Sequence, residues 1–219
     1  MSQSVIKVKT SDNSYTLYSH KYNQHYHSIY GAVTESLHIY IGLGLKKFRD
    51  RNINILEIGY GTGLNAVLSF IENLRLNNSI YYHGIDIYPL SLKIIQDLGF
   101  VELLKNYDIP LELFCNKWDE EAKLSDNFIL KKQNSDLLSF ESDLKYDLIY
   151  FDAFSSDVQA ELWEENVFQK LGKLTNLGGI LVTYCSKGVV KQNLRNSGFI
   201  VNRFIGPPGK HHVVCATKI

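Results

Sequence analysis

The feature that most constrains the fold is a regular alternation of strand-like and helix-like segments along most of the chain. From residue 52 onward, short apolar runs are followed by stretches whose apolar residues recur at helical spacing. Such alternation is typical of a mostly parallel sheet with helices on both faces. We therefore expect a doubly wound α/β fold, with strands at residues 53–58, 80–87, 111–114, 128–133, 146–152 and 179–184.

The helices of this fold are expected between the strands, and one segment remains ambiguous. The helical stretches are residues 63–76, 90–107, 159–174 and 187–196, whereas residues 116–127 favour neither state. Two final strand-like segments, 199–205 and 212–218, are joined by a Gly-Pro-Pro-Gly turn with no helix between them. They should form an antiparallel hairpin at one edge of the sheet. That ending is typical of class I methyltransferases, whereas a nicotinamide-binding Rossmann domain usually has another helix there.

The first 50 residues are expected to form an extension of the same domain. Residues 6–10 and 14–18 flank a polar turn and predict a β-hairpin. Residues 31–48 predict a helix, because apolar side chains recur at helical spacing at Val33, Leu37, Ile41, Leu45 and Phe48. Without a linker-like stretch, we expect one domain over residues 1–219, with a Rossmann-like core at 51–219.

Composition excludes several classes of protein. The 23 basic and 23 acidic residues balance, so a nucleic acid would have to be held by a local patch rather than by bulk charge. The 3 cysteines form no CxxC pair, which favours a reducing compartment. No apolar run is long enough for a membrane span, and the start lacks a signal-peptide core. We expect a cytoplasmic protein that needs no metal, since no histidine or cysteine set has convincing ligand spacing.

The most informative motif is LEIGYGTGLN at residues 56–65, between an expected strand and an expected helix. Alternate glycines let the backbone turn sharply and approach a ligand, while the following helix offers free N–H groups. The spacing differs from the G-x-G-x-x-G phosphate loop, and an acid precedes the first glycine. A cationic cofactor without a pyrophosphate fits better, and S-adenosylmethionine is such a molecule. The candidate cofactor contacts here are Glu57, Gly59, Tyr60, Gly61, Thr62, Gly63 and Asn65.

Three acids at the ends of later strands extend this candidate site. Asp86 lies where doubly wound folds place the group that binds ribose hydroxyls. Asp136 follows another strand and is either an adenine contact or a solvated loop acid. Asp152 ends a strongly apolar strand at the edge where ligands of open α/β sheets bind. It is a candidate for cofactor binding and for catalysis, with capping of the next turn as the alternative.

Four separated segments resemble the methyltransferase domain of MnmC-type tRNA-modifying enzymes. They are EIGYGTGLN at 57–65, DLIYFDAFSS at 147–156, TYCSKGVV at 183–190 and GPPGKH at 206–211. The resemblance implies a class I methyltransferase that uses S-adenosylmethionine and acts on the wobble uridine of tRNA. It also implies methylation of a 5-aminomethyl-(2-thio)uridine amine to 5-methylaminomethyl-(2-thio)uridine. The oxidase domain that some family members carry is not expected in this chain.

The resemblance implies a role for Asp152 in orienting the amine and accepting its proton. Candidate substrate contacts are Tyr30, Glu35, Phe154, Tyr184, Lys187, Pro207 and Lys210. Aromatic side chains can stack on an exposed base, although single aromatics are more often part of a core. For Glu35, the alternative is a hydrated charge on the surface of a helix. The Gly-Pro-Pro-Gly segment is either a stiff turn or a loop that shapes the substrate site.

Other functions remain open on the sequence alone. The same scaffold can methylate a small molecule or a protein, and the balanced charge favours that reading slightly. A cofactor-binding protein without catalysis is a second alternative, against which the complete glycine loop and Asp152 argue. A nicotinamide dehydrogenase requires the other glycine spacing.

Overall fold

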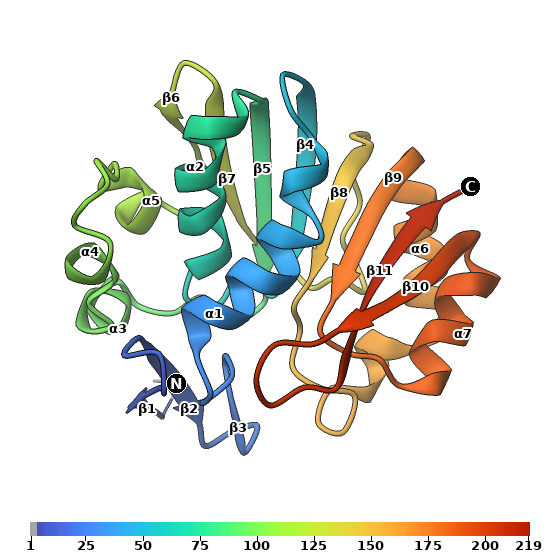
Figure 1. Ribbon diagram of the computed structural model, residues 1–219, viewed down its shortest axis with the longest axis horizontal. Helices are drawn as coiled ribbons and strands as arrows, with labels where there is room; N and C mark the ends of the chain where they lie inside the picture. The colour runs from blue at the N-terminus through green and yellow to red at the C-terminus, as the bar shows by residue number, and fades with distance from the viewer. Residues whose placement is uncertain (1–3) are drawn as a thin grey trace.

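An eight-stranded mixed sheet forms the centre of the computed structural model, which describes residues 4–219 (Figure 1). The strand order is β10-β11-β9-β8-β4-β5-β7-β6. The strands are β4 (Asn52–Ile58), β5 (Ser79–Asp86), β6 (Glu121–Ser125), β7 (Phe128–Asn134), β8 (Tyr146–Phe151), β9 (Thr175–Thr183), β10 (Phe199–Ile205) and β11 (His212–Lys218). After β4, the chain first adds β5, β6 and β7 on one side of this strand, and later adds β8 to β11 on its other side.

The strand directions confirm the expected fold class. β4 is parallel to β5 and β8, and the pairs β5–β7 and β8–β9 are also parallel. β11 is antiparallel to both β10 and β9, so the expected C-terminal hairpin is present at one edge. β6, in the segment that the sequence left ambiguous, pairs antiparallel with β7 at the other edge.

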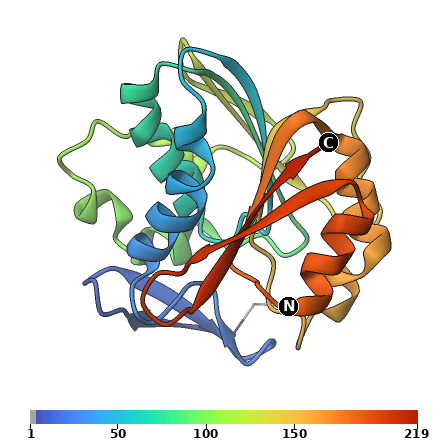
Figure 2. The ribbon, with the colours of Figure 1, turned by 45° about the vertical axis from the view of Figure 1, so that its right-hand side comes forward.

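Helices cover both faces of the sheet (Figures 1 and 2). One face carries α1 (Ala32–Ser36), a π-helical turn that continues it (Leu37–Gly42), and α2 (Leu64–Leu76). The other carries α6 (Glu165–Leu174) and α7 (Gly188–Asn196). The short helices are a 3-10 turn (Leu45–Lys47), α3 (Leu92–Asp97), α4 (Phe100–Leu103), α5 (Glu112–Cys115) and a second 3-10 turn (Ala160–Trp163).

The two apolar layers follow from the alternation of side chains along each strand. In β8, Leu148 and Tyr150 pack toward α1 and α2, whereas Ile149 and Phe151 pack toward α6 and α7. A strand buried on both faces therefore has a continuous apolar sequence, as residues 148–151 do. Within residues 4–219, no helix is long and apolar enough to cross a membrane.

Three expected elements differ from the structure. Residues 111–114, predicted as a strand, belong to the region of α5, because a four-residue apolar run has no distinguishing periodicity. The helix predicted at 90–107 is divided at Gly99, whose φ of 71° is left-handed and ends α3 before α4 begins. The helix predicted at 159–174 is interrupted by Glu164, whose backbone is extended.

The N-terminal helix buries most of the apolar residues that predicted it, and Leu37 is the exception, since Ile41, Leu45 and Phe48 are buried and Val33 packs against the core. Leu37 is 42% exposed, whereas Glu35 is 7% exposed and Tyr40 only 1%. The π-helical turn widens the helix after Ser36 and rotates the residues that follow it relative to an α-helix. Tyr40 lies in this turn and packs against Tyr150 of β8, with ring centroids 5.2 Å apart.

A small antiparallel sheet lies at the end of the molecule that also carries the β10–β11 loop (Figures 1 and 2). It contains the predicted hairpin, β1 (Val5–Lys9) and β2 (Tyr15–Ser19), and a third strand, β3 (Gln24–His25). In the turn between β1 and β2, Asp12 accepts a hydrogen bond from the backbone N–H of Thr34 at 2.8 Å. This bond connects the small sheet to the beginning of α1.

We expect Gly84→Ala to destabilise the sheet. A Cβ on Gly84 would lie 2.2 Å from Cδ2 of the buried Tyr60 ring. Overpacking of this kind costs about 1–3 kcal/mol of unfolding free energy, measurable by urea denaturation. Gly188→Ala is the control, because nothing lies within 4 Å of its added Cβ. Equal stability of the two variants would contradict this packing argument.

Candidate active site

The glycine loop turns where β4 ends and α2 begins. Gly59, Gly61 and Gly63 all have positive φ, of 83°, 50° and 78°. A Cβ on Gly59 would lie 2.7 Å from the backbone oxygen of Asp152, so only glycine lets these two strand ends approach. The backbone N–H of Asp152 in turn donates to Ile58 O at 2.9 Å.

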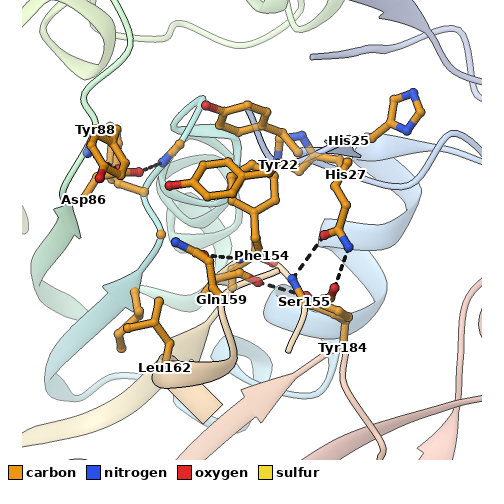
Figure 3. A pocket seen from close by; sticks show the side chains of 18 of the residues that line it. Tyr22, His25, His27, Asp86, Tyr88, Phe154, Ser155, Gln159, Leu162 and Tyr184 are labelled. Atoms are coloured by element: carbon orange, nitrogen blue, oxygen red, sulfur yellow. Dashed lines mark hydrogen bonds between the residues drawn. The ribbon is translucent and has the colours of Figure 1, made fainter. Parts of the chain in front are cut away.

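A cavity of about 620 Å³ opens at this edge of the sheet (Figure 3). Its walls come from the glycine loop, the ends of β5 and β8, the segment after β7, the β10–β11 loop and residues 22–30 of the N-terminal extension. Parallel strands bring their carboxyl ends to one edge, which is where open α/β sheets bind ligands. The volume suits a cofactor of nucleoside size.

Asp86 holds the glycine loop from the end of β5. Its Oδ2 accepts from the backbone N–H of Gly61 at 2.9 Å, and its Oδ1 accepts from that of Tyr88 at 2.8 Å. Burial raises the pKa of Asp86, and the two backbone bonds oppose that shift. Each oxygen keeps a further lone pair for a ligand hydroxyl. Asp136 also lines the cavity, and its Oδ1 accepts from the N–H of Leu138 at 2.9 Å.

Two buried carboxyl groups share one amide beneath the loop. Nδ2 of Asn65 donates to Oε1 of Glu57 and to Oδ2 of Asp152, each at 2.9 Å. The remaining oxygen of Glu57 accepts from Tyr82, and that of Asp152 accepts from Tyr40 at 2.5 Å. Only Asp152 of this pair lines the cavity. Glu57 therefore supports the site from below.

Burial dominates the ionisation of this pair. It raises the pKa of Asp152 to about 8; the like charge of Glu35 adds to the rise, whereas the bond from Tyr40 opposes it. Burial also holds the pKa of Glu57 well above its ordinary value. Burial thus disfavours the charged form of Asp152 in the ligand-free protein, and a cation beside it would favour the carboxylate.

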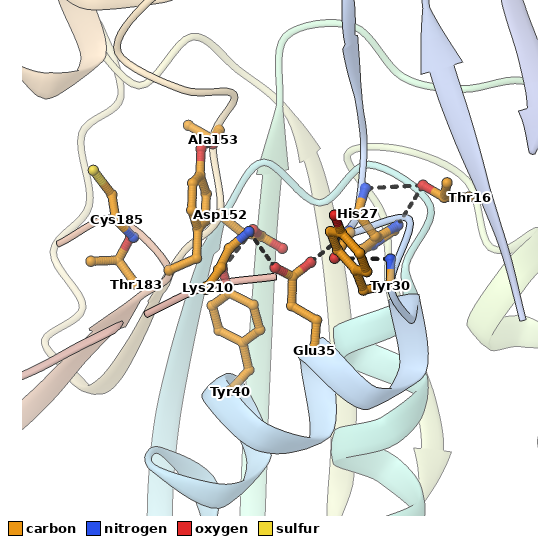
Figure 4. A network of polar contacts seen from close by, with 12 residues as sticks. Thr16, His27, Tyr30, Glu35, Tyr40, Asp152, Ala153, Thr183, Cys185 and Lys210 are labelled. Carbon is orange, nitrogen blue, oxygen red and sulfur yellow. Dashed lines mark hydrogen bonds and ion pairs between the residues drawn. The ribbon is translucent and has the colours of Figure 1, made fainter. Parts of the chain in front are cut away.

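A lysine and a glutamate from distant parts of the chain form an ion pair beside Asp152 (Figure 4). Nζ of Lys210, from the β10–β11 loop, lies 2.7 Å from Oε1 of Glu35. Oε2 of Glu35 accepts from the backbone N–H of Ser28 at 2.7 Å. The same Nζ lies 5.0 Å from the centre of the Tyr184 ring, whose hydroxyl donates to Ala153 O at 2.9 Å.

Aromatic side chains form another part of the cavity wall. The ring of Phe154 stacks on Tyr22, with centroids 4.5 Å apart, and meets the edge of Tyr26 at 4.9 Å. Gln24 and Ser155 hold the two segments together, since Gln24 Nε2 donates to the serine hydroxyl and Gln24 Oε1 accepts the serine backbone N–H. The N-terminal extension is thereby tied to the loop after β8.

The structure gathers most of the predicted site residues around this cavity. Those that line it are Tyr30, Glu35, Gly59, Tyr60, Gly61, Asp86, Asp136, Asp152, Phe154, Tyr184 and Lys210. The Tyr60 ring itself is buried, and Tyr30 is 53% exposed beside Gly209. The site roles of these residues stay predictions.

The other predicted residues lie outside the cavity lining. They are Glu57, Thr62, Gly63, Asn65, Lys187 and Pro207. Thr62 and Asn65 are buried, and Gly63 precedes α2. Lys187 is paired with Asp157 at 2.8 Å, so its charge is already partly balanced. Pro207 is buried at the base of the β10–β11 loop.

Sequence reasoning missed several side chains that build the site. Tyr22, Gln24 and Gln159 line the cavity, and the hydroxyl of Tyr40, in the π-helical turn after α1, donates a hydrogen bond to Asp152. The first two lie at residues 21–30, a stretch of the sequence that is rich in histidine and tyrosine. Tyr40 lies at helical spacing from Val33 and Leu37, so the apolar pattern indicated its burial but not its hydrogen bond to Asp152. Within residues 4–219, no three histidine, cysteine or acidic residues are grouped to hold a metal ion.

We expect Tyr40→Phe to raise the pKa of Asp152 above about 8 in the ligand-free protein, because the lost hydrogen bond favours the carboxylate. Carbon-13 NMR of the aspartate carboxyls across pH 5–10 measures the change. Tyr150→Phe is the matched control, since that buried hydroxyl bonds to Ser69 instead. An Asp152 titration unchanged in Tyr40→Phe would show that the hydrogen bond has no such effect.

Comparison with known proteins agrees with this geometry. Residues 114–219 match the family described as S-adenosyl-L-methionine-dependent methyltransferase. The tRNA 5-methylaminomethyl-2-thiouridine biosynthesis bifunctional protein MnmC of Leptospira borgpetersenii is 27% identical over 208 residues, or 87% of this chain and 32% of that protein. MnmC of Burkholderia multivorans is 25% identical over 214 residues, or 89% and 32%. The chain thus spans about a third of the length of these curated relatives.

Solved structures share the fold. MNMC2 from Aquifex aeolicus superimposes with a TM-score of 0.75 at 23% identity, covering 98% of this chain and 70% of that one. The magnesium protoporphyrin IX methyltransferase of Synechocystis with bound S-adenosylmethionine gives 0.52 at 13% identity, covering 82% and 76%. The sequence matches, the fold and the cavity together identify this chain as an S-adenosylmethionine-dependent methyltransferase related to the methyltransferase domain of MnmC proteins.

Proposed function

We propose that this chain methylates the primary amine of 5-aminomethyl-(2-thio)uridine at the wobble position of tRNA. The product would be 5-methylaminomethyl-(2-thio)uridine, the nucleoside named in its curated relatives. The observation that carries the proposal is one cavity that contains both a cofactor-type loop and an ionisable cluster suited to an amine. That cluster is Asp152 with the Glu35–Lys210 ion pair.

The two parts of the cavity suit two different ligands. Asp86 and the glycine loop offer carboxylate oxygens and backbone groups to a nucleoside cofactor. Asp152, Glu35 and Lys210 offer charges to the group that accepts the methyl (Figure 4). Asp86 and Tyr88 lie across the cavity from Tyr184 (Figure 3). We therefore assign the side of Asp86 to the cofactor and the side of Tyr184 to the methyl acceptor.

The chemistry needs a neutral amine and a place for its proton. S-adenosylmethionine supplies an electrophilic methyl group, to which the nitrogen lone pair forms a bond as the carbon–sulfur bond breaks. The substrate ammonium must first lose a proton, and the Asp152 carboxylate is the acceptor that we assign. A pKa of about 8 is well matched to this role near neutral pH. Tyr40 and Asn65 hold the carboxyl in position, each through one hydrogen bond.

A wobble uridine in an anticodon loop can leave its stack more easily than a base in a duplex. Tyr30, at the exposed side of the cavity, and Phe154, within its wall, are the rings that we assign to stack on the uracil. The proposal therefore places the base at the cavity entrance and its aminomethyl arm beside Asp152.

The first test is transfer of labelled methyl from S-adenosylmethionine to tRNA that carries unmethylated 5-aminomethyl uridine, followed by nucleoside analysis. We expect label in 5-methylaminomethyl uridine, and none in tRNA with an unmodified wobble uridine, because only the amine has a nucleophilic lone pair in reach. If folded enzyme that binds S-adenosylhomocysteine leaves the tRNA unlabelled, the substrate proposal is wrong. Small-molecule and protein acceptors then become the candidates.

The second test concerns the proton acceptor. Asp152→Asn keeps the size of the side chain but cannot take the proton, so we expect single-turnover methylation to slow by about 10²–10⁴-fold. Asp143→Asn, an exposed acid outside the cavity, should retain full activity. Cofactor binding by calorimetry controls for folding. A near-normal single-turnover rate in Asp152→Asn would assign the proton to another group.

A further inference from the structure

We propose that Lys210 is a specificity-determining residue that keeps the incoming amine neutral, by occupying Glu35 and by presenting a positive charge to the acceptor side of the cavity. This inference rests on the proposed function, because it concerns the protonation state of the amine that is methylated. It gives the β10–β11 loop a role in the choice of acceptor.

The position of Lys210 is fixed by contacts from three parts of the fold. Its Nζ pairs with Glu35 of α1 at 2.7 Å and lies over the ring of Tyr184, which follows β9. Gly209 next to it packs against the ring of Tyr30, leaving no room for a Cβ. The lysine side chain is 26% exposed, and both it and Glu35 line the cavity. Lys210 is therefore held at the reaction site.

The Glu35–Lys210 ion pair affects the protonation state of an amine in the cavity. A bare Glu35 carboxylate in this half-enclosed cavity would attract an ammonium ion and stabilise its charged form, which has no lone pair for attack. Because Glu35 forms an ion pair with Lys210, the negative charge of its carboxylate is already balanced. The lysine charge also disfavours a second positive charge nearby, as in sites where one ammonium lowers the pKa of a neighbouring amine.

The surrounding titratable groups define what else acts on the amine and on Asp152. Negative charge comes from Glu35 of α1 and from Asp157 after β8, which is paired with Lys187, while Lys210 brings positive charge. Burial disfavours the charged form of Glu57 of β4. The neutral titratable groups are Tyr40, Tyr184 and Cys185, with raised pKa values, and His27, whose pKa burial lowers. Among these groups, Lys210 is the cation that lines the cavity.

The test is a pair of charge-changing variants with opposite expected effects. Lys210→Met keeps most of the apolar stem and removes the charge, so the acidic limb of the kcat–pH profile should move up by about one pH unit. KM at neutral pH should fall or stay constant while kcat falls, because the ammonium form is bound unproductively. Lys210→Arg retains the charge and should restore the profile. Glu35→Gln can still accept from Ser28, and it should move the acidic limb down.

A second readout needs no turnover. Lys210 favours the charged form of Asp152 and Glu35 disfavours it, so Lys210→Met should raise and Glu35→Gln should lower the carbon-13 titration midpoint of Asp152. Thermal unfolding and adenosylhomocysteine binding establish that each variant is folded. A purely structural lysine would lower stability without moving either midpoint.

The possible failures can be told apart. If the unaltered enzyme does not methylate tRNA bearing 5-aminomethyl uridine, the proposed function is wrong and the inference about its amine falls with it. If that enzyme is active but Lys210→Met and Glu35→Gln share its pH profile, the inference alone is overturned. Shifts of opposite sign, with Lys210→Arg resembling the unaltered enzyme, support it.

Discussion

The site depends on one buried amide that holds two carboxyl groups. Asn65, in the first turn of α2, donates to Glu57 at the end of β4 and to Asp152 after β8. Those hydrogen bonds connect α2, which follows the glycine loop, to the ends of the neighbouring strands β4 and β8. Burying two acids is unfavourable unless they are neutral or well bonded, and here they are both raised in pKa and hydrogen-bonded. The position of Asp152 at the cavity follows from this arrangement.

The N-terminal extension completes the site that the sheet begins. Tyr40 and Glu35 reach Asp152 and Lys210 from the helix, and Gln24 connects the small sheet to the loop after β8. The Rossmann-like core supplies the cofactor side of the cavity, whereas the extension and the β10–β11 loop supply much of the acceptor side. The proposed function therefore assigns acceptor specificity to segments outside the parallel strands.

Much of the fold could be predicted because its signals are local. The strand–helix alternation predicted the doubly wound sheet, and the strongly apolar segment at residues 146–152 predicted a strand, which the structure shows as β8. The turn between residues 205 and 212 predicted the terminal hairpin. The errors arose where local signals are weak. The four-residue helix α5 is too short to show a periodicity, and the apolar pattern of residues 90–107 does not reveal the left-handed φ of Gly99 that divides the helix.

The sequence by itself determined the fold class, the glycine loop and the acids at the strand ends, because periodicity, glycine spacing and strand-end position are properties of neighbouring residues. Only the tertiary structure decided which of these groups share the cavity and in what ionic state. Glu57 lies outside the cavity lining, Glu35 is a buried ion-pair partner of Lys210, and the Tyr40 hydroxyl donates a hydrogen bond to Asp152. The reason is physical: burial and pairing between residues far apart set the pKa values, and distances across the chain are absent from any local pattern.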